Sequence, residues 1–211
     1  MILESYHLAP VIETAPWVLS DGGALDIDRC PDCWERRAHI ERYVFACKVF
    51  KHQRVLDFGC GVGFGLEMLA RENTVIGVDS SAEAAAICLL RRGVSIWNSM
   101  PEEEWDGGVA LEVIEHLEDP VSFIATIPAR HLVASVPVQP TMARNHHHKH
   151  DFTIESFRAL METRFEIRSW WIQVMPFHSD PAVAIFHGEA RAASERRRLA
   201  EKWKGTEFRT T

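Results

Sequence analysis

Several common features are missing from this 211-residue sequence, and each absence narrows the class of protein. No apolar run approaches the ~18 residues of a membrane-spanning helix, and Met1–Pro10 lacks the basic-then-apolar pattern of a signal peptide. The five cysteines are an odd number in a chain without an export signal, which favours reduced thiols over a disulfide framework. We therefore expect a cytoplasmic protein that does not enter a membrane.

Positive charge is also scarce. The chain has 23 Lys and Arg against 30 Asp and Glu, a formal net charge of -7, which argues against nucleic-acid binding by the whole surface. Residues 191–211 carry seven basic and three acidic side chains, so residues 1–190 hold 16 basic against 27 acidic. The composition, with 46% hydrophobic and 25% charged residues, is that of an ordinary globular protein, and the length fits one domain.

Short apolar runs alternate with stretches of helical spacing along most of the chain. This alternation predicts an α/β fold whose mainly parallel sheet is covered by helices on both faces. The last two strands have little sequence between them, which predicts an antiparallel hairpin at one edge. The expected strands are Arg54–Phe58, Thr74–Val78, Val94–Trp97, Gly108–Val113, His131–Val136, Phe165–Val174 and Ala182–His187. The expected helices are Trp34–Lys51, Gly63–Arg71, Ser81–Arg92, Pro120–Ile127 and Thr153–Thr163.

Two flanking segments frame the domain that we expect at 37–190. Residues 1–36 form an irregular extension that we interpret as a lid, and 191–211 a basic C-terminal helix or tail, with a helix candidate over Glu189–Lys204. Within the extension, Cys30-Pro31-Asp32-Cys33 has the spacing of half a zinc site. No second pair follows, so we interpret these cysteines as surface thiols.

The most specific local signal is V-L-D-F-G-C-G-V-G-F-G over residues 55–65, where a first strand turns into a first helix. Glycines at such a turn let the backbone approach a ligand closely. A dinucleotide fingerprint needs glycine at its first, third and sixth positions, but the sixth position counted from Gly59 is Phe64. No G-K-S or G-K-T follows, which excludes a P-loop.

The acidic residues beside this loop indicate which of the remaining types of ligand it binds. Asp57 at the mouth of the loop repels a pyrophosphate and attracts a cation, while the helix N-terminus favours a carboxylate. Asp79 ends the second strand twenty residues after Gly59, the distance at which an acid accepts both ribose hydroxyls. A nucleoside that carries a positively charged amino acid and no phosphate fits all three features. That ligand is S-adenosylmethionine.

Three motifs in order resemble those of the Rossmann-like (class I) S-adenosylmethionine-dependent methyltransferases. V-L-D-F-G-C-G-V-G resembles their first motif and V-I-G-V-D (75–79) their second. The segment W-D-G-G-V-A-L-E-V-I-E-H-L-E-D-P (105–120) resembles the fourth-strand motif of the subgroup with E-V-I-E-H-L. The resemblance covers roughly Arg37 to Gly188. It implies a seven-stranded sheet with a reversed final strand.

The resemblance also implies which residues contact the cofactor. The loop backbone should cradle the methionyl part, Asp57 should hold the amino group, Asp79 the ribose, and Asn98 or Ser99 the adenine. The positions carried over to the cofactor site are Arg42, Asp57, Gly59, Cys60, Gly61, Gly63, Asp79, Ser80, Asn98, Ser99 and Glu112.

Two segments supply candidates for chemistry at the acceptor. Glu112, Glu115 and His116 lie just beyond the fourth strand, where carboxyl-end loops line the ligand crevice of an α/β sheet. The histidine-rich run His146–His150 follows the next strand and is expected to fold back over this crevice, facing His116. Methyl transfer needs a positioned acceptor and a base for its proton, and one histidine near neutral pKa suffices.

Two subgroups of the family carry similar segments. Sugar and glycan methyltransferases have N-x-x-H-x-x-E-[FY]-[TS] after an upstream H-x-x-R-Y, which His39–Tyr43 and Asn145–Thr153 resemble, with Gln173 where that group often has glutamine. Small-RNA 3′-end 2′-O-methyltransferases have E-x-x-E-H and R-N-H-D-H-K-F-E-W segments that bind magnesium. The equivalent set here is Glu112, Glu115, His116 and either His146 or His148, but the F-x-P-P segment of that group is absent.

These observations favour a methyltransferase that acts on an oxygen of a small-molecule or glycan-type acceptor. His116 or His148 is the candidate base, and Glu112 and Glu115 the candidates that orient the acceptor. A site without metal is favoured. Two alternatives stay open: metal-dependent 2′-O-methylation of an RNA 3′ end through Glu112, Glu115, His116 and His148, and a non-catalytic cofactor-binding regulator or subunit. The acceptor and the oligomeric state are not encoded in any motif.

Overall fold

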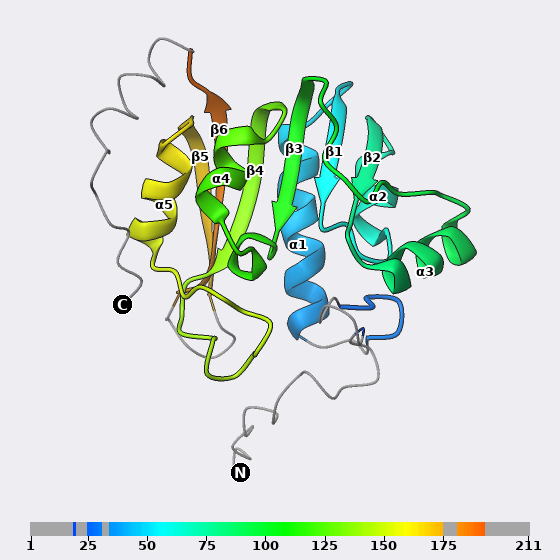
Figure 1. Ribbon diagram of the computed structural model, residues 1–211, viewed down its shortest axis with the longest axis horizontal. Coiled ribbons are helices and arrows are strands. Elements are labelled where there is room, and N and C mark those ends of the chain that lie inside the picture. Colours follow the sequence, from blue (N-terminus) through cyan, green and yellow to red (C-terminus); the bar gives the residue numbers. More distant parts are fainter. Residues whose placement is uncertain (1–18, 20–24, 31–33, 175–180, 193–211) are drawn as a thin grey trace, which may run out of the picture.

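A computed structural model describes residues 19, 25–30, 34–174 and 181–192. Its centre is a six-stranded sheet of order β2-β1-β3-β4-β6-β5, parallel from β2 to β4 and antiparallel at β4–β6 and β6–β5 (Figure 1). The strands are β1 (Arg54–Phe58), β2 (Thr74–Val78), β3 (Trp105–Leu111), β4 (Ala129–Pro137), β5 (Phe165–Val174) and β6 (Pro181–Ala190). The helices are α1 (Trp34–Val49), α2 (Phe64–Leu69), α3 (Ala82–Arg92), α4 (Pro120–Thr126) and α5 (Ile154–Glu162), with a 3-10 turn η2 (Ile114–His116).

Helices cover both faces of the sheet, because the buried strands are apolar on both sides. One face packs against α4 and α5 through a core that includes Leu132, Phe157 and Phe186. The other face packs against α1 and α2 through a core that includes Phe50 and Val133. The predicted α/β class, the mainly parallel sheet and the antiparallel hairpin at its edge are thereby confirmed.

The prediction of a third strand at Val94–Trp97 is wrong. Within the described residues this segment makes one isolated parallel bridge, Val78 to Trp97, so the sheet has six strands where the family resemblance implied seven. Trp97 donates to the carbonyl of Gly77 and accepts from the N–H of Asp79, both at 2.9 Å. Val94 and Trp97 stay 40% and 38% exposed, so little apolar burial holds the segment against the sheet edge.

Among the boundaries that differ from expectation, two concern the candidate site and the C-terminal segment. The strand expected at Gly108–Val113 is β3, which ends at Leu111 because Glu112 has a φ of 57°, outside the extended region. The helix candidate Glu189–Lys204 is wrong at its start, since β6 continues to Ala190. Its remainder, with most of 191–211, lies outside the described residues.

The parallel strands bring four loops to one end of the sheet, drawn at the bottom of Figure 1. The glycine loop follows β1, Asp79 follows β2, Glu112 follows β3 and the histidine-rich segment follows β4. Ser81 accepts from the N–H of Ala84 and caps α3 at this same end, as its position predicted. Within the described ranges, no helix is long and apolar enough to cross a membrane.

Candidate active site

The glycine loop depends on three glycines with left-handed backbone. Gly59, Gly61 and Gly63 have φ of 63°, 52° and 80°, values that side-chain-bearing residues rarely adopt. A Cβ at Gly59 would lie 2.5 Å from the side chain of Val113. A Cβ at Gly63 would lie 2.6 Å from the sulfur atom of Cys88. The loop therefore turns tightly from β1 into α2 and presents its backbone at the carboxyl end of the sheet.

Asp57 is the buried acid of this loop. Its side chain is fully buried and accepts from the hydroxyl of Tyr43, 3.0 Å to Oδ2 and 3.3 Å to Oδ1. Burial raises the pKa of Asp57 to about 8, the Tyr43 hydrogen bond lowers it and the charge of Asp79 raises it. Burial disfavours the ionised form of this carboxyl group, so a cationic group placed beside it would stabilise the carboxylate and lower its pKa.

Asp79 ties the glycine loop to the end of β2. Its Oδ2 accepts from the N–H of Gly61 and its Oδ1 from the N–H of Ser81, both at 2.8 Å. The other residues proposed for the nucleoside, Ser80, Asn98 and Ser99, are exposed along the same side of the site. Asp79 therefore positions the glycine loop relative to the start of α3.

Arg42 on α1 is a buried cation without a carboxylate partner among its hydrogen bonds in the described structure. Its Nη1 donates to Oε1 of Gln173 at 2.8 Å and its Nη2 lies 3.5 Å from Nδ1 of His39. The amide of Gln173 in turn donates to the carbonyl of Ala38 and to Glu41. Arg42 is 6% exposed, and its Nε has no hydrogen-bond partner among the described atoms. This arrangement suits an incoming anionic group.

Glu112 is fixed by the neighbouring strand β4. The hydroxyl of Ser135 donates to Oε1 of Glu112 at 2.7 Å, and the N–H of Glu112 donates to the carbonyl of Ser135 at 3.1 Å. These contacts hold Glu112 in its left-handed conformation. Glu112 is thus held by β4 and is not one of the three residues, Glu115, His116 and His148, whose ligand atoms meet beside it.

Glu115, His116 and His148 form a cluster. One side-chain ligand atom of each lies within 4.8 Å of the others, and the two imidazole rings meet edge to face with centroids 4.6 Å apart. Glu115 is 1% exposed, and both its carboxylate oxygens lack a hydrogen-bond partner in the described structure. Burial, with the charge of Glu112 second, raises the pKa of Glu115 well above its usual value.

The hydrogen bonds of the two rings orient them. His116 Nδ1 lies 3.1 Å from the carbonyl oxygen of His147, an acceptor, so Nδ1 carries the proton and Nε2 is the basic nitrogen. His148 Nδ1 lies 2.6 Å from the hydroxyl of Thr141, which also contacts Asp151 at 3.4 Å. Burial lowers the pKa of His116, which keeps this ring neutral near pH 7.

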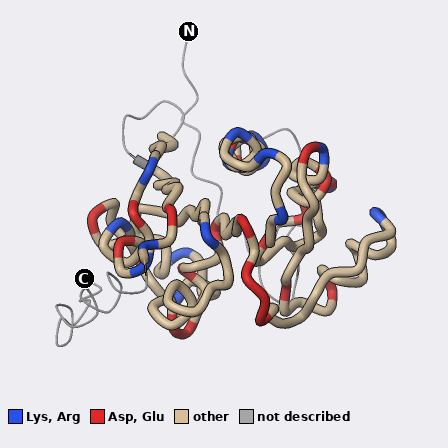
Figure 2. The backbone as a smooth tube through the Cα atoms, turned by 90° about the horizontal axis from the view of Figure 1, so that it is seen from above, with Lys and Arg blue, Asp and Glu red and all other residues tan. Residues whose placement is uncertain are grey.

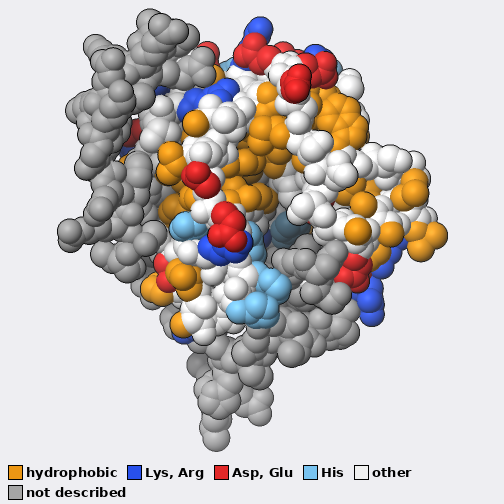
Figure 3. All heavy atoms as spheres, in the orientation of Figure 1, with side chains coloured by type: hydrophobic (Ala, Val, Ile, Leu, Met, Phe, Trp, Pro, Cys, Tyr) orange, Lys and Arg blue, Asp and Glu red, His pale blue; other side chains and the backbone are white. Residues whose placement is uncertain are grey.

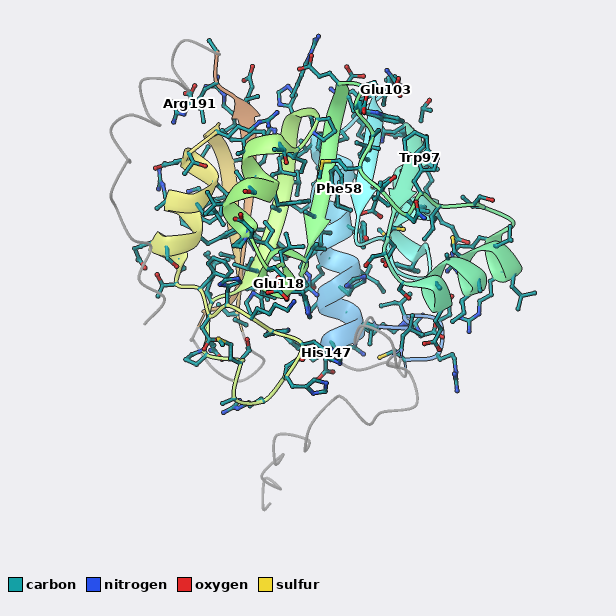
Figure 4. The ribbon with its side chains drawn as sticks, viewed as in Figure 1. Phe58, Trp97, Glu103, Glu118, His147 and Arg191 are labelled. Carbon is teal, nitrogen blue, oxygen red and sulfur yellow. The ribbon has the colours of Figure 1, made fainter. Side chains whose placement is uncertain are left out.

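The histidine-rich loop is held against η2 by its backbone. The N–H groups of Lys149 and His150 donate to the carbonyl of Glu115 at 2.8 and 3.2 Å, and His150 Nε2 lies 2.9 Å from the carbonyl of Leu117. Figure 3 shows the histidines gathered at the lower end of the molecule, and Figure 4 places His147 there, with Glu118 above it. The loop that was expected to face His116 therefore does so.

A segment of the N-terminal extension lies beside the glycine loop. Asp26, which is 1% exposed, pairs with Arg91 of α3 through two hydrogen bonds of 2.7 and 3.0 Å. Ile27 and Leu19 pack with Val62 of the glycine loop. We call residues 25–30 the strap. The interpretation as surface thiols is wrong for Cys30, which is 2% exposed because the turn made by its N–H bond to the carbonyl of Asp26, at 3.0 Å, leaves it buried. Cys33 lies outside the described residues.

Comparison with known proteins decides the family. A family model described as "Methyltransferase domain" matches residues 36–164, more than half of the chain. The chain belongs to this methyltransferase family. The glycine loop, Asp57, Asp79 and the Glu115 cluster all lie inside the matched range. S-adenosyl-L-methionine is accordingly the cofactor of this methyltransferase domain.

Relatives of this methyltransferase include a ubiquinone biosynthesis O-methyltransferase of Rhodopseudomonas palustris (strain TIE-1), 32% identical over 117 residues. That match covers 50% of this chain and 46% of the relative, so the chain spans about half the length of the curated relatives it matches. The N-methyltransferase NodS from Bradyrhizobium japonicum WM9, solved with S-adenosyl-L-homocysteine, superposes with a TM-score of 0.61 at 17% identity, over 82% of this chain and 93% of that one. The small RNA methyltransferase HEN1 superposes with a TM-score of 0.57 at 21% identity. That match covers 74% of this chain and 25% of the HEN1 chain. At these identities both structures bear on the fold alone.

Sequence reasoning located the acids and histidines of this methyltransferase but missed their partners. Tyr43 appeared as part of H-x-x-R-Y without a role, and Gln173 as a family-like glutamine. Ser135 and Thr141 carried no signal, because a serine in an apolar strand and a threonine in a loop are common. Each becomes visible once β4 and α1 are placed beside the site.

Proposed function

We propose that this chain transfers a methyl group from S-adenosyl-L-methionine to a hydroxyl oxygen of a small-molecule or glycan-type acceptor, as a member of the subgroup with E-V-I-E-H-L. The observation that carries the proposal is the meeting of two features at one end of the sheet. A buried acid without a cationic partner stands at the glycine loop, and two oriented imidazoles, His116 and His148, stand beyond the carboxyl ends of β3 and β4. The O-methyltransferase names of the curated relatives support oxygen over nitrogen as the acceptor atom.

The cofactor's charges match buried groups of the opposite sign. The cofactor amino group would lie beside Asp57, and its carboxylate beside the guanidinium of Arg42. Asp79 would accept from the ribose hydroxyls, since the carboxylate has further lone pairs beyond its two backbone bonds. The remaining proposed contacts are the backbone of Gly59, Cys60, Gly61 and Gly63, with Ser80, Asn98, Ser99 and Glu112 around the nucleoside.

The acceptor proton would go to a histidine of the cluster. When bound, the cofactor supplies a methyl carbon already activated by a sulfonium. His116 Nε2 would take the proton of the acceptor hydroxyl as its oxygen bonds to that carbon, and the carbon–sulfur bond breaks to leave S-adenosyl-L-homocysteine. His148 and Glu115 would hold the acceptor, with Thr141 and Asp151 fixing the ring of His148.

We further propose that residues 1–36 cover the cofactor and that 37–190 form the catalytic unit, with 191–211 as a basic tail. The proposal that these residues cover the cofactor is supported by one contact: Ile27 of the strap packs against Val62 of the glycine loop. A methyl acceptor then enters between the strap and the histidine-rich loop. Basic and acidic residues are interspersed along the described chain (Figure 2), which does not favour a polynucleotide acceptor.

Cofactor binding is tested first, by calorimetric titration of S-adenosyl-L-methionine into the wild-type chain and Asp79→Ala. We expect Asp79→Ala to weaken binding at least about tenfold, because it removes a ribose acceptor and loosens the loop. Asp106→Ala, at the opposite end of the sheet, is the matched control and should bind as the wild type does. Unchanged affinity in Asp79→Ala would mean that the cofactor placement is wrong.

Transfer is tested with the labelled methyl cofactor and a panel of phenolic, catecholic and sugar hydroxyl acceptors. His116→Ala should lower kcat by about 10²–10⁴ with cofactor affinity retained, because a general base contributes that much. Cofactor binding with no transfer to any acceptor class would instead support the non-catalytic regulator.

A metal-assisted reaction is the second candidate, and the geometry of Glu115, His116 and His148 favours it. Two imidazoles and a carboxylate within 4.8 Å match the ligand types of a divalent ion. Under this alternative, activity on a 3′-terminal ribose requires magnesium and is lost in His148→Ala. Activity that is indifferent to a chelator excludes it.

A further inference from the structure

Gln173, near the carboxyl end of β5, reaches the candidate cofactor site from the edge of the sheet. β5 pairs antiparallel with β6, and β6 antiparallel with β4, so β5 runs in the direction of β4 and ends at the same end of the sheet as the glycine loop (Figure 1). Gln173 is 4% exposed, and its Oε1 accepts from Nη1 of Arg42 on α1 at 2.8 Å. Gln173 belongs to none of the cofactor contacts proposed above.

The NH₂ end of the Gln173 side chain fixes which atom of the amide faces Arg42. Its Nε2 donates to the carbonyl of Ala38 at 3.2 Å and to Oε2 of Glu41 at 3.0 Å. A carbonyl and a carboxylate only accept hydrogen bonds, so the NH₂ group must face these two partners and the amide oxygen must face the guanidinium. The carboxylate of Glu41 therefore lies one amide away from Arg42, and the group that contacts Arg42 from β5 is neutral.

The second neighbour of the guanidinium is neutral as well. Nη2 of Arg42 lies 3.5 Å from Nδ1 of His39, and this nitrogen can pair with an N–H donor only as an acceptor. Burial, with the charge of Arg42 second, lowers the pKa of His39 to about 3, so its ring carries no charge near pH 7. Two neutral side chains thus hold Arg42, and its charge stays available to a ligand.

We propose that Gln173 is a positioning residue that makes Arg42 selective for the carboxylate of the cofactor. The amide oxygen of Gln173 holds the guanidinium without neutralising it, whereas a carboxylate at this position would form an ion pair and compete with the ligand. Nε of Arg42, which has no hydrogen-bond partner in the described structure, is a donor left for that ligand. The inference rests on the proposed function, which places the cofactor carboxylate beside Arg42.

The test compares two probes by calorimetric titration into the full chain. The probes are S-adenosyl-L-methionine and decarboxylated S-adenosylmethionine, which keeps the amino group and the sulfonium. We expect the wild-type chain to bind the decarboxylated probe at least about tenfold more weakly, because charge-assisted hydrogen bonds are lost. Gln173→Met should weaken binding of S-adenosyl-L-methionine about tenfold and leave binding of the decarboxylated probe within about twofold. Retained binding of the decarboxylated probe shows that the variant is folded.

An exchange of two side chains is the matched second variant. Glu41→Gln combined with Gln173→Glu keeps the net charge and the one amide and one carboxylate of the pair, but moves the carboxylate to Arg42. This double variant should lose S-adenosyl-L-methionine binding at least as strongly as Gln173→Met does, again without loss for the decarboxylated probe. Ser169→Ala, on the same strand, is the control and should bind both probes as the wild type does.

A double-mutant cycle shows whether Gln173 acts through Arg42. Arg42→Met should remove the preference for the carboxylate, and adding Gln173→Met should then change neither affinity further. The inference is overturned, with the proposed function intact, if the wild-type chain binds both probes equally, or if Gln173→Met and the exchange variant weaken both probes by the same factor or weaken neither. A wild-type chain that binds neither probe overturns the proposed cofactor placement and this inference with it.

Discussion

At the scale of single residues, Asp57 couples the site to pH. Burial raises its pKa to about 8 in the folded protein, whereas an unfolded chain has about 3.9. Between these values the folded state holds the extra proton, so the free energy of unfolding falls as pH rises, by at most about 1.4 kcal/mol per pH unit. Asp57→Asn removes this titration. We expect Asp57→Asn to be the more stable protein at about pH 7.5, by a margin that shrinks toward about pH 5.

Denaturant unfolding of both proteins without cofactor, across this pH range, measures the margin. Tyr43→Phe supplies a matched comparison, because it removes the hydrogen bond that lowers the pKa of Asp57 and so extends the loss of stability to higher pH. Parallel pH profiles for the wild type and Asp57→Asn would contradict the buried, protonated acid.

Some residues of the candidate site can be predicted from the sequence, and others cannot. Asp57 and Asp79 are predictable because each ends a strand at a fixed distance from the glycines, and parallel strands end together. Arg42 came from a family motif, and its tie to Gln173 spans 131 positions in the chain. No local pattern encodes such a long-range contact. The same holds for Ser135, whose role depends on β4 lying beside β3.

At the scale of elements, α1 and α2 meet through Gly65. A Cβ built there would lie 2.0 Å from the ring of Tyr43, whose hydroxyl bonds Asp57. Gly65→Ala must push α2 or the Tyr43 ring aside, and we expect it to lower the free energy of unfolding by about 1–3 kcal/mol, as overpacking does. It should also weaken cofactor binding, because the ring that moves holds the buried acid. Chemical denaturation and cofactor titration measure the two effects.

Gly93→Ala is the comparison, since Gly93 has a φ of 65° but no atom within 4 Å of a built Cβ. Gly93→Ala should lower the free energy of unfolding by about 1 kcal/mol, through backbone strain alone, and should leave the cofactor affinity unchanged. The close-packing argument is rejected if Gly65→Ala is no more harmful than Gly93→Ala in either assay.

Three strands were predicted at their observed bounds, although two of them, β2 and β5, lie at the edges of the sheet, whereas one further segment was wrongly predicted as a strand. Arg54–Phe58, Thr74–Val78 and Phe165–Val174 have the same bounds in the structure as in the prediction. Val94–Trp97 carries the apolar residues of a strand but lies at the sheet edge beyond β2, where half of each ladder is missing. A sequence window does not distinguish an edge position from a central one.

At the scale of the whole molecule, cofactor binding and folding are linked. A ligand that binds the folded state alone raises the free energy of unfolding by about 2.7 kcal/mol at 100 times its Kd. We expect S-adenosyl-L-methionine to raise the melting temperature of the wild-type chain, and Asp79→Ala to lose most of this rise at the same concentration. Differential scanning measurements with and without cofactor test this, and equal shifts in both proteins would argue against a role of Asp79 in the site.

The strap joins the N-terminal extension to the sheet through the pair Asp26–Arg91, which is buried at the acid and 32% exposed at the base. Two charge-assisted hydrogen bonds in a partly dry setting should couple the residues by about 1–3 kcal/mol. A double-mutant cycle on Asp26→Ala and Arg91→Ala measures this coupling by denaturant unfolding. The exposed i, i+4 pair Arg158–Glu162 is the control, and its cycle should give only about 0.3–0.5 kcal/mol.

The same cycle, read by cofactor titration, decides whether the strap is part of the site. Ile27 reaches Val62 from the strap, so releasing Asp26 should loosen one wall of the glycine loop. We expect Asp26→Ala and Arg91→Ala to weaken cofactor binding by similar factors, and the double variant no further than either alone, because both changes break the same contact between the strap and α3. If stability falls while affinity holds, the strap fastens the fold and does not cover the cofactor.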